Sequence, residues 1–93
     1  MSPDGVPSEA IRHYHRQILT KAIAALDEQA VDERLVSGIT LATDPKRLPL
    51  MQKELSQFLQ DFGRKYGTGR RAGEVYQLEV AFFRLTEKEG QDA

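Results

Sequence analysis

The sequence contains no cysteine among its 93 residues. This absence excludes a disulfide framework, a thiolate zinc site and a cysteine nucleophile together. The chain also lacks any apolar run approaching the roughly 18 residues that a membrane span requires. Its first residues, MSPDGVPSEA, lack the basic and then apolar pattern of a secretion signal. We therefore expect a cytoplasmic protein with no membrane partner.

An excess of one charge is missing as well. Thirteen basic and fourteen acidic residues leave a net charge of -1, so no global positive field attracts a phosphate backbone. We expect no direct binding of nucleic acid by this segment. The apolar share of 40% and the charged share of 29% are ordinary for a folded protein. A domain this short buries only about 60 to 65% of its unfolded surface, which makes burial against a partner plausible.

The spacing of apolar residues predicts two helices. The first is expected from Ser8, as a capping residue, to about Ala30. The second is expected to begin near Leu48, because Pro49 is tolerated only in a first turn, and to end at a left-handed Gly67. The predicted apolar stripes are Ile11, Tyr14, Ile18, Leu19, Ala22, Ile23 and Leu26 in the first helix, and Met51, Leu55, Phe58, Leu59, Phe62 and Tyr66 in the second.

Alternating apolar residues predict two strands, over residues 35–43 and 74–86. The element order α-β-α-β predicts a small α/β (α+β) domain over residues 8–86, with two helices packed on one face of a short sheet. The helix stripes and the inner face of the last strand would form the core; that inner face is Tyr76, Leu78, Val80 and Phe82. Residues 1–7 are expected to be a disordered linker and residues 87–93 a flexible tail.

The far face of the last strand is also apolar, at Ala81, Phe83 and Leu85. A two-stranded sheet is marginally stable in water, and an open strand that is apolar on both faces is prone to aggregate. We therefore expect a homodimer, or docking on a neighbouring domain, that extends the sheet and covers these three residues.

Three residues are candidates for a ligand site or a switch. His15 lies on the apolar stripe of the first helix, where it would be a core-edge residue bonded to a loop carbonyl, or alternatively a ligand contact or pH-sensitive switch. Arg70 and Arg71 lie in the segment GTGRRAG, which would be a solvated turn or alternatively an anion site. This segment runs from a helix into a strand, opposite to known phosphate loops.

Neither a metal site nor a catalytic centre is expected. His13 and His15 are two residues apart on a helix, so they point to different sides and cannot share a metal. Ser37 and Ser56 have no G-x-S-x-G context. The paired acids at positions 27/28 and 32/33 fall in a connection, where they solvate a turn. We predict a protein that is not an enzyme and has no cofactor.

Three segments together resemble a known family: HYHRQILTKAIAAL, SGITLATDPKRLPLMQKELSQFLQDF and EVYQLEVAFFRLT. They are similar to the uncharacterised C-terminal domain of a bacterial family of paralogous, predicted transcriptional regulators with an N-terminal winged helix-turn-helix. Arg84 stands where that family is expected to have proline. The resemblance covers residues 11–86 and implies a dimerisation or regulatory role without known catalytic residues. A small-ligand or peptide sensor, with its site near the first helix and the sheet, is the alternative.

Overall fold

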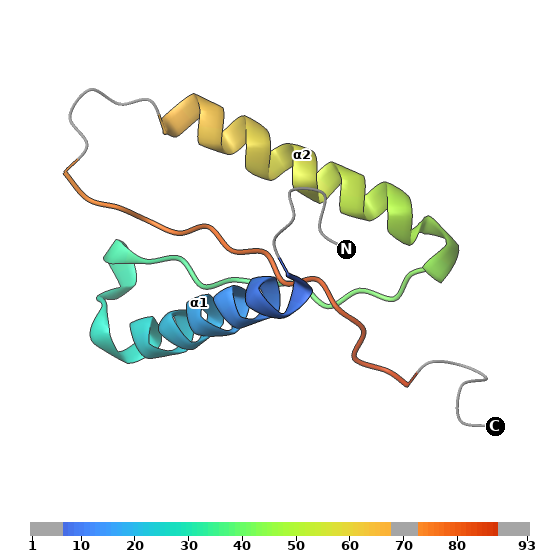
Figure 1. Cartoon of the computed structure of the whole chain (residues 1–93), viewed down its shortest axis with the longest axis horizontal. Coiled ribbons are helices and arrows are strands. Elements are labelled where there is room, and N and C mark those ends of the chain that lie inside the picture. The colour runs from blue at the N-terminus through green and yellow to red at the C-terminus, as the bar shows by residue number, and fades with distance from the viewer. Residues whose placement is uncertain (1–6, 68–72, 88–93) are drawn as a thin grey trace. The chain divides into compact units, whose positions relative to one another are not determined.

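Residues 7–67 and 73–87 are described by a computed structural model of the chain (Figure 1). Its elements are helices α1 (Ser8–Glu28) and α2 (Leu48–Tyr66) and the one-turn helices η1 (Val31–Glu33) and η2 (Pro45–Arg47). The chain divides into two compact units, Met1–Thr43 and Asp44–Ala93. Each unit is described by itself, and a single domain over residues 8–86 stays a prediction. Apart from Pro7 and Glu87, the expected linker 1–7 and tail 87–93 lie outside the described residues.

The start of α1 agrees with the sequence, but its cap does not. The helix begins at Ser8, yet Pro7 is the capping residue, and the Pro7 side chain forms no cap hydrogen bond. The Pro7 carbonyl instead accepts hydrogen bonds from the amides of Ala10 (3.0 Å) and Ile11 (3.2 Å). Since Ser8 is already the first helical residue, its hydroxyl is one position too late for the predicted cap.

The end of α1 is closed by an arginine from beyond the helix. Arg34 donates from Nε to the Gln29 carbonyl (3.1 Å) and from a terminal guanidinium nitrogen to the Leu26 carbonyl (3.2 Å). Carbonyls at a helix C-terminus have no partner within the helix, and they carry partial negative charge. The Arg34 guanidinium folds back over these carbonyls and supplies both hydrogen-bond donors and a compensating positive charge. The intervening turn η1 is fixed by the Ala30 amide, which donates to Glu33 Oε1 (3.0 Å).

Both predicted limits of α2 are confirmed at Leu48 and Tyr66. The chain enters through η2, where Asp44 Oδ1 accepts from the Lys46 amide (3.0 Å) and Pro45 supplies the first helical residue. Pro49 lies in the first turn of α2, where its missing N–H removes no helical bond.

Gly67 ends α2 as predicted, but not in the left-handed conformation. Its φ is -87° and ψ is 0°, within the range of ordinary residues. Its amide donates to the Gly63 carbonyl at 2.8 Å. A Cβ at Gly67 would lie 2.5 Å from the Gly63 oxygen. Glycine is therefore required here by the close approach of the backbone, and not by a positive φ.

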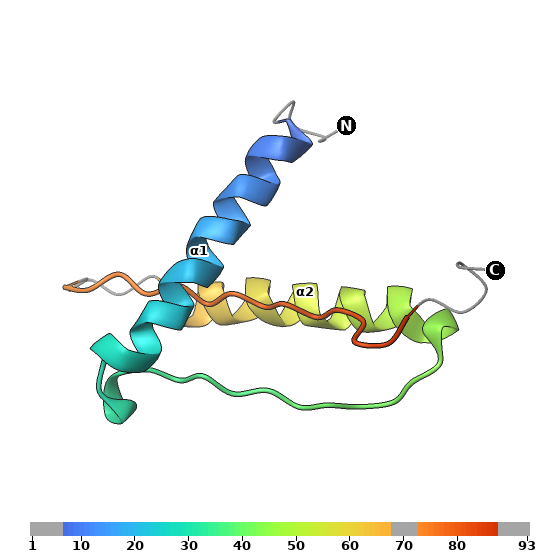
Figure 2. The same ribbon diagram turned by 90° about the horizontal axis from the view of Figure 1, so that it is seen from below.

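The predicted α/β fold is wrong, because no strand occurs in residues 7–67 and 73–87. Residues 34–44 and 73–87 run as stretches without regular structure (Figures 1 and 2). Among the described residues, backbone hydrogen bonds outside the helices join positions three or four apart, as at Glu33 to Ala30 and Arg47 to Asp44. Alternation of apolar and polar residues shows only that an extended segment would have one apolar and one polar face. A strand additionally needs a ladder of bonds to a second segment, and these segments lack it.

The predicted core is wrong for the same reason. Without a sheet the helices have no layer to cover, and none of the described residues is buried. Half-buried apolar side chains occur along both helices, at Ile18, Ala24, Ala25, Met51, Leu55 and Leu59. The apolar faces of the elements are thus largely open to solvent.

Candidate functional site

The apolar face of α1 is the first open surface. Its large side chains Ile11, Leu19 and Leu26 are between 38% and 46% exposed, while Ile18 and Ala25 are half-buried. At 100° per residue these positions fall on one side of the helix. In proteins most of the stability of a helix comes from covering such a face. Within the unit of residues 1–43, this face is incompletely covered.

His15 lies on this face and is exposed. Its ring contacts that of Tyr14 edge to face, with centroids 5.3 Å apart and planes at 73°. The geometry is favourable for two aromatic rings. His15 is therefore a surface residue next to a tyrosine, and its role as a ligand contact or switch stays a prediction.

An open depression lies on α1, and His15 is not among the described residues that line it. Because all of them come from one helix, they cannot surround a small molecule on several sides. They are His13, Tyr14, Arg16, Gln17, Ile18, Thr20 and Lys21. Arg70 and Arg71, the other two candidates for a ligand site, lie outside the described residues.

A row of aromatic rings follows the second open surface, on α2. The ring centroids of Phe58 and Phe62 are 5.6 Å apart, and those of Phe62 and Tyr66 are 4.9 Å apart. The Lys65 ammonium lies 5.2 Å from the centre of the Tyr66 ring, within the range of a cation–π contact. The three rings are between 41% and 63% exposed. The sequence pattern assigned them to a core, whereas they form an open ladder along the helix.

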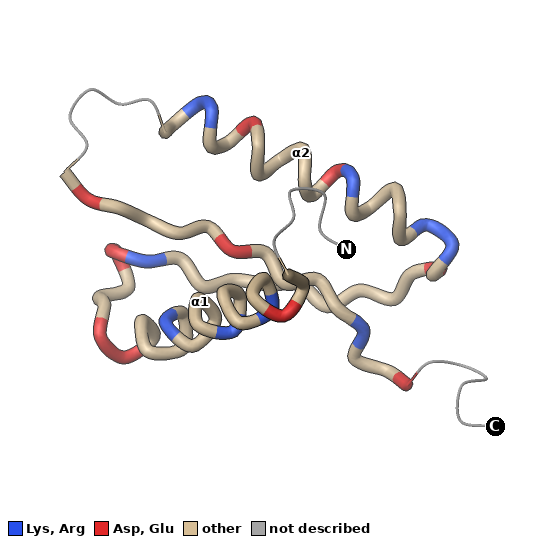
Figure 3. Tube along the Cα trace, viewed as in Figure 1, with Lys and Arg blue, Asp and Glu red and all other residues tan. Residues whose placement is uncertain are grey.

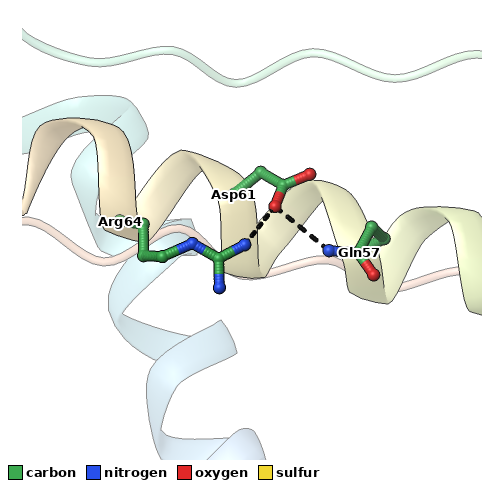
Figure 4. Close-up of polar contacts among 3 residues, drawn as sticks. All are labelled: Gln57, Asp61 and Arg64. Carbon is green, nitrogen blue, oxygen red and sulfur yellow. Dashed lines mark hydrogen bonds and ion pairs between the residues drawn. The ribbon is translucent and has the colours of Figure 1, made fainter.

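A polar network beside this ladder fixes an acidic side chain (Figure 4). Asp61 pairs with Arg64 one turn later, and Asp61 Oδ1 accepts from Gln57 Nε2 at 3.0 Å. Both members of the ion pair are exposed, so the pair adds little stability. An open depression lies next to this network, lined by Asp61 and Lys65 together with the rings of Phe58, Phe62 and Tyr66.

The third open surface is the predicted interface on the last segment. Phe83 and Leu85 are 70% and 75% exposed, whereas Val80 and Phe82 are each 39% exposed. Ala81 is also exposed. The side chains expected on the far face are therefore more open than their neighbours. Side chains two residues apart lie close enough to interact along this segment. Gln77 Nε2, for example, donates to Glu79 Oε1 at 3.2 Å.

In the part of the chain that the structure describes, no three potential metal ligands among His, Asp and Glu gather in one place. Neither α1 nor α2 is long and apolar enough to pass through a lipid bilayer. What the described residues do present is apolar and aromatic surface in three places. Such surface is suited to contact with another polypeptide.

A comparison with known proteins adds one finding. A family model described as a domain of unknown function matches residues 1–85. No curated protein matches the chain, and no solved structure does.

Proposed function

Because the chain belongs to the family Domain of unknown function (DUF4423), we propose a role for it from its open surfaces and its resemblance. It is a non-catalytic dimerisation and regulatory module. It forms the C-terminal domain of a predicted bacterial transcriptional regulator that acts in the cytoplasm. Its partner is a second copy of the same chain.

One observation carries this proposal: large apolar side chains remain open along α1, α2 and the last segment. Burying one such side chain fully stabilises by about 1.5 to 3 kcal/mol. Association of two chains would recover free energy of this kind. The near-neutral net charge of -1 removes one obstacle, because two copies with little net charge repel each other weakly.

The interface is proposed to include Ala81, Phe83 and Leu85. Sedimentation equilibrium of the whole chain should give a dimer at micromolar concentration. The paired substitution Phe83→Ser with Leu85→Ser should weaken dimerisation by about 100-fold, because it removes two apolar anchors. Leu35→Ser is the matched control, since Leu35 is 88% exposed and lies outside this segment. It should change the dissociation constant by less than about threefold.

A chain that remains monomeric at several hundred micromolar, and that unfolds cooperatively there, would contradict the proposal. The sensor alternative has less support. The depression on α1 has described lining residues from a single helix and omits His15.

A further inference from the structure

The aromatic ladder of α2 has a charged edge and an uncharged edge. The charged residues of this helix are Lys53, Glu54, Asp61, Arg64 and Lys65 (Figure 3). At 100° per residue, Lys65 and Glu54 lie about 60° and 80° round the helix from the central ring of the ladder, Phe62. At the same angles on the other side of that ring, the helix has no charged residue. The charges therefore border the ladder along one edge.

Two charges on this edge have no ion-pair partner within the helix. Asp61, which lies further round on the same side, is already bound by Gln57 and Arg64. Glu54 has no base three or four positions away on either side, so it cannot form the ion pair that is common along a helix. Lys65 is 11 residues from Glu54, about 16 Å along the axis. These two side chains are therefore available to a second polypeptide.

We propose that α2 pairs with α2 of a second copy in antiparallel orientation, through the aromatic ladder. This inference rests on the proposed function, because it requires a dimer, and it specifies one helix of the contact and its direction. In an antiparallel pair with two-fold symmetry, the same edge of both helices meets. Lys65 of one copy then lies opposite Glu54 of the other, twice over. A parallel pair would set the charged edge against the uncharged edge and leave both charges unpaired.

The apolar contacts require the same register as the charges. The charge pairs place the two-fold axis midway between positions 54 and 65. Phe58 lies opposite Phe62 of the other copy when the axis is at position 60, and Leu55 lies opposite Tyr66 when it is midway between 60 and 61. These three positions of the axis agree within one residue, about 1.5 Å along the helix. A single two-fold contact therefore accommodates the ladder and the charges together.

Charge reversal tests this pairing. Glu54→Lys and Lys65→Glu should each raise the dissociation constant of the dimer about tenfold, because each replaces two ion pairs with two like-charge contacts. The double variant, which exchanges the two charges, should return it to within about threefold of the original. Lys53→Glu is the matched control, since it changes the net charge as Lys65→Glu does but lies about 180° from Phe62. It should leave the dissociation constant within about threefold of the original.

Helicity separates an effect between helices from one within the helix. Glu54→Lys creates no like-charge pair in its own helix, because the third and fourth positions on either side are uncharged. Its far-ultraviolet circular dichroism should therefore equal that of the original chain when both are dilute monomers. A weaker dimer with unchanged helicity supports the pairing. Reduced helicity of the monomer would show that the charge acts within α2, and would overturn the inference.

Orientation is measured with a spin label on Leu50→Cys, which is the sole thiol because the chain has no cysteine. Leu50 is 54% exposed and lies about 120° from Phe62, outside the ladder. A two-fold axis near position 60 predicts about 30 Å or more between the two labelled positions. A separation below about 20 Å would indicate a parallel pair and overturn the inference.

The outcomes distinguish this pairing from the proposed function. A dimer that is unaffected by charge reversal, or that is not restored in the double variant, would overturn the pairing of α2 alone. A protein that is monomeric throughout would overturn the proposed function as well.

Discussion

Arg34 shows how much a single side chain contributes where no core exists. Its guanidinium reaches back to the carbonyls of Leu26 and Gln29, and its side chain is half-buried. The sequence alone does not identify Arg34 as a cap of α1. A base six positions after the last helical residue is a usable signal for such a cap only when the intervening turn is known.

Replacing this residue tests its role as a cap. Arg34→Ala should lower the free energy of unfolding by about 1 kcal/mol, because two carbonyls at the negative end of α1 lose their donor. Urea denaturation followed by circular dichroism measures the change. Lys53→Ala removes the same charge from a site without such contacts, and should have an effect below about 0.5 kcal/mol. Equal effects of the two substitutions would show that only net charge matters.

At the scale of the element, helix limits were accessible from the sequence because their causes are local. Pro49 marks the first turn of α2 and Gly67 follows its last residue, and the helix between these limits has nineteen residues. The reason for Gly67 was not accessible, since it depends on a distance between two backbone atoms. The strands were predicted incorrectly because pairing is a property of two segments and cannot be read from the alternation within one.

The end of α2 carries a specific prediction. Gly67→Ala should loosen the last turn and cost about 1 kcal/mol or more, because the new Cβ meets the Gly63 oxygen at 2.5 Å. Amide hydrogen exchange should rise at Gly67 and in the last turn of α2. Gly38→Ala is the matched control, since a Cβ there meets no atom within 4 Å. Unchanged exchange in the Gly67 variant would contradict the contact.

At the scale of the whole molecule, the sequence indicated exposed apolar surface at Phe83 and Leu85 but assigned the aromatic row of α2 to a core. Both conclusions used the same pattern of apolar spacing. Spacing identifies which side chains share a face, yet it does not state what covers that face.

Dimerisation makes thermal stability depend on protein concentration. A hundredfold increase, from about 5 to 500 μM, should raise the melting temperature by roughly 10 °C, because mass action adds about 2.7 kcal/mol to the folded dimer. Differential scanning calorimetry at several concentrations measures this shift. A melting temperature independent of concentration would identify a monomeric folding unit.

The stretch that connects η1 to η2, residues 34–44, has a further consequence. Eleven residues without regular structure span at most about 40 Å. When α1 binds a partner chain, α2 is tethered near that partner at a roughly millimolar effective concentration. Two individually weak contacts would then give one slowly dissociating complex. Shortening this tether until it cannot span both sites would remove that avidity without altering any contact residue.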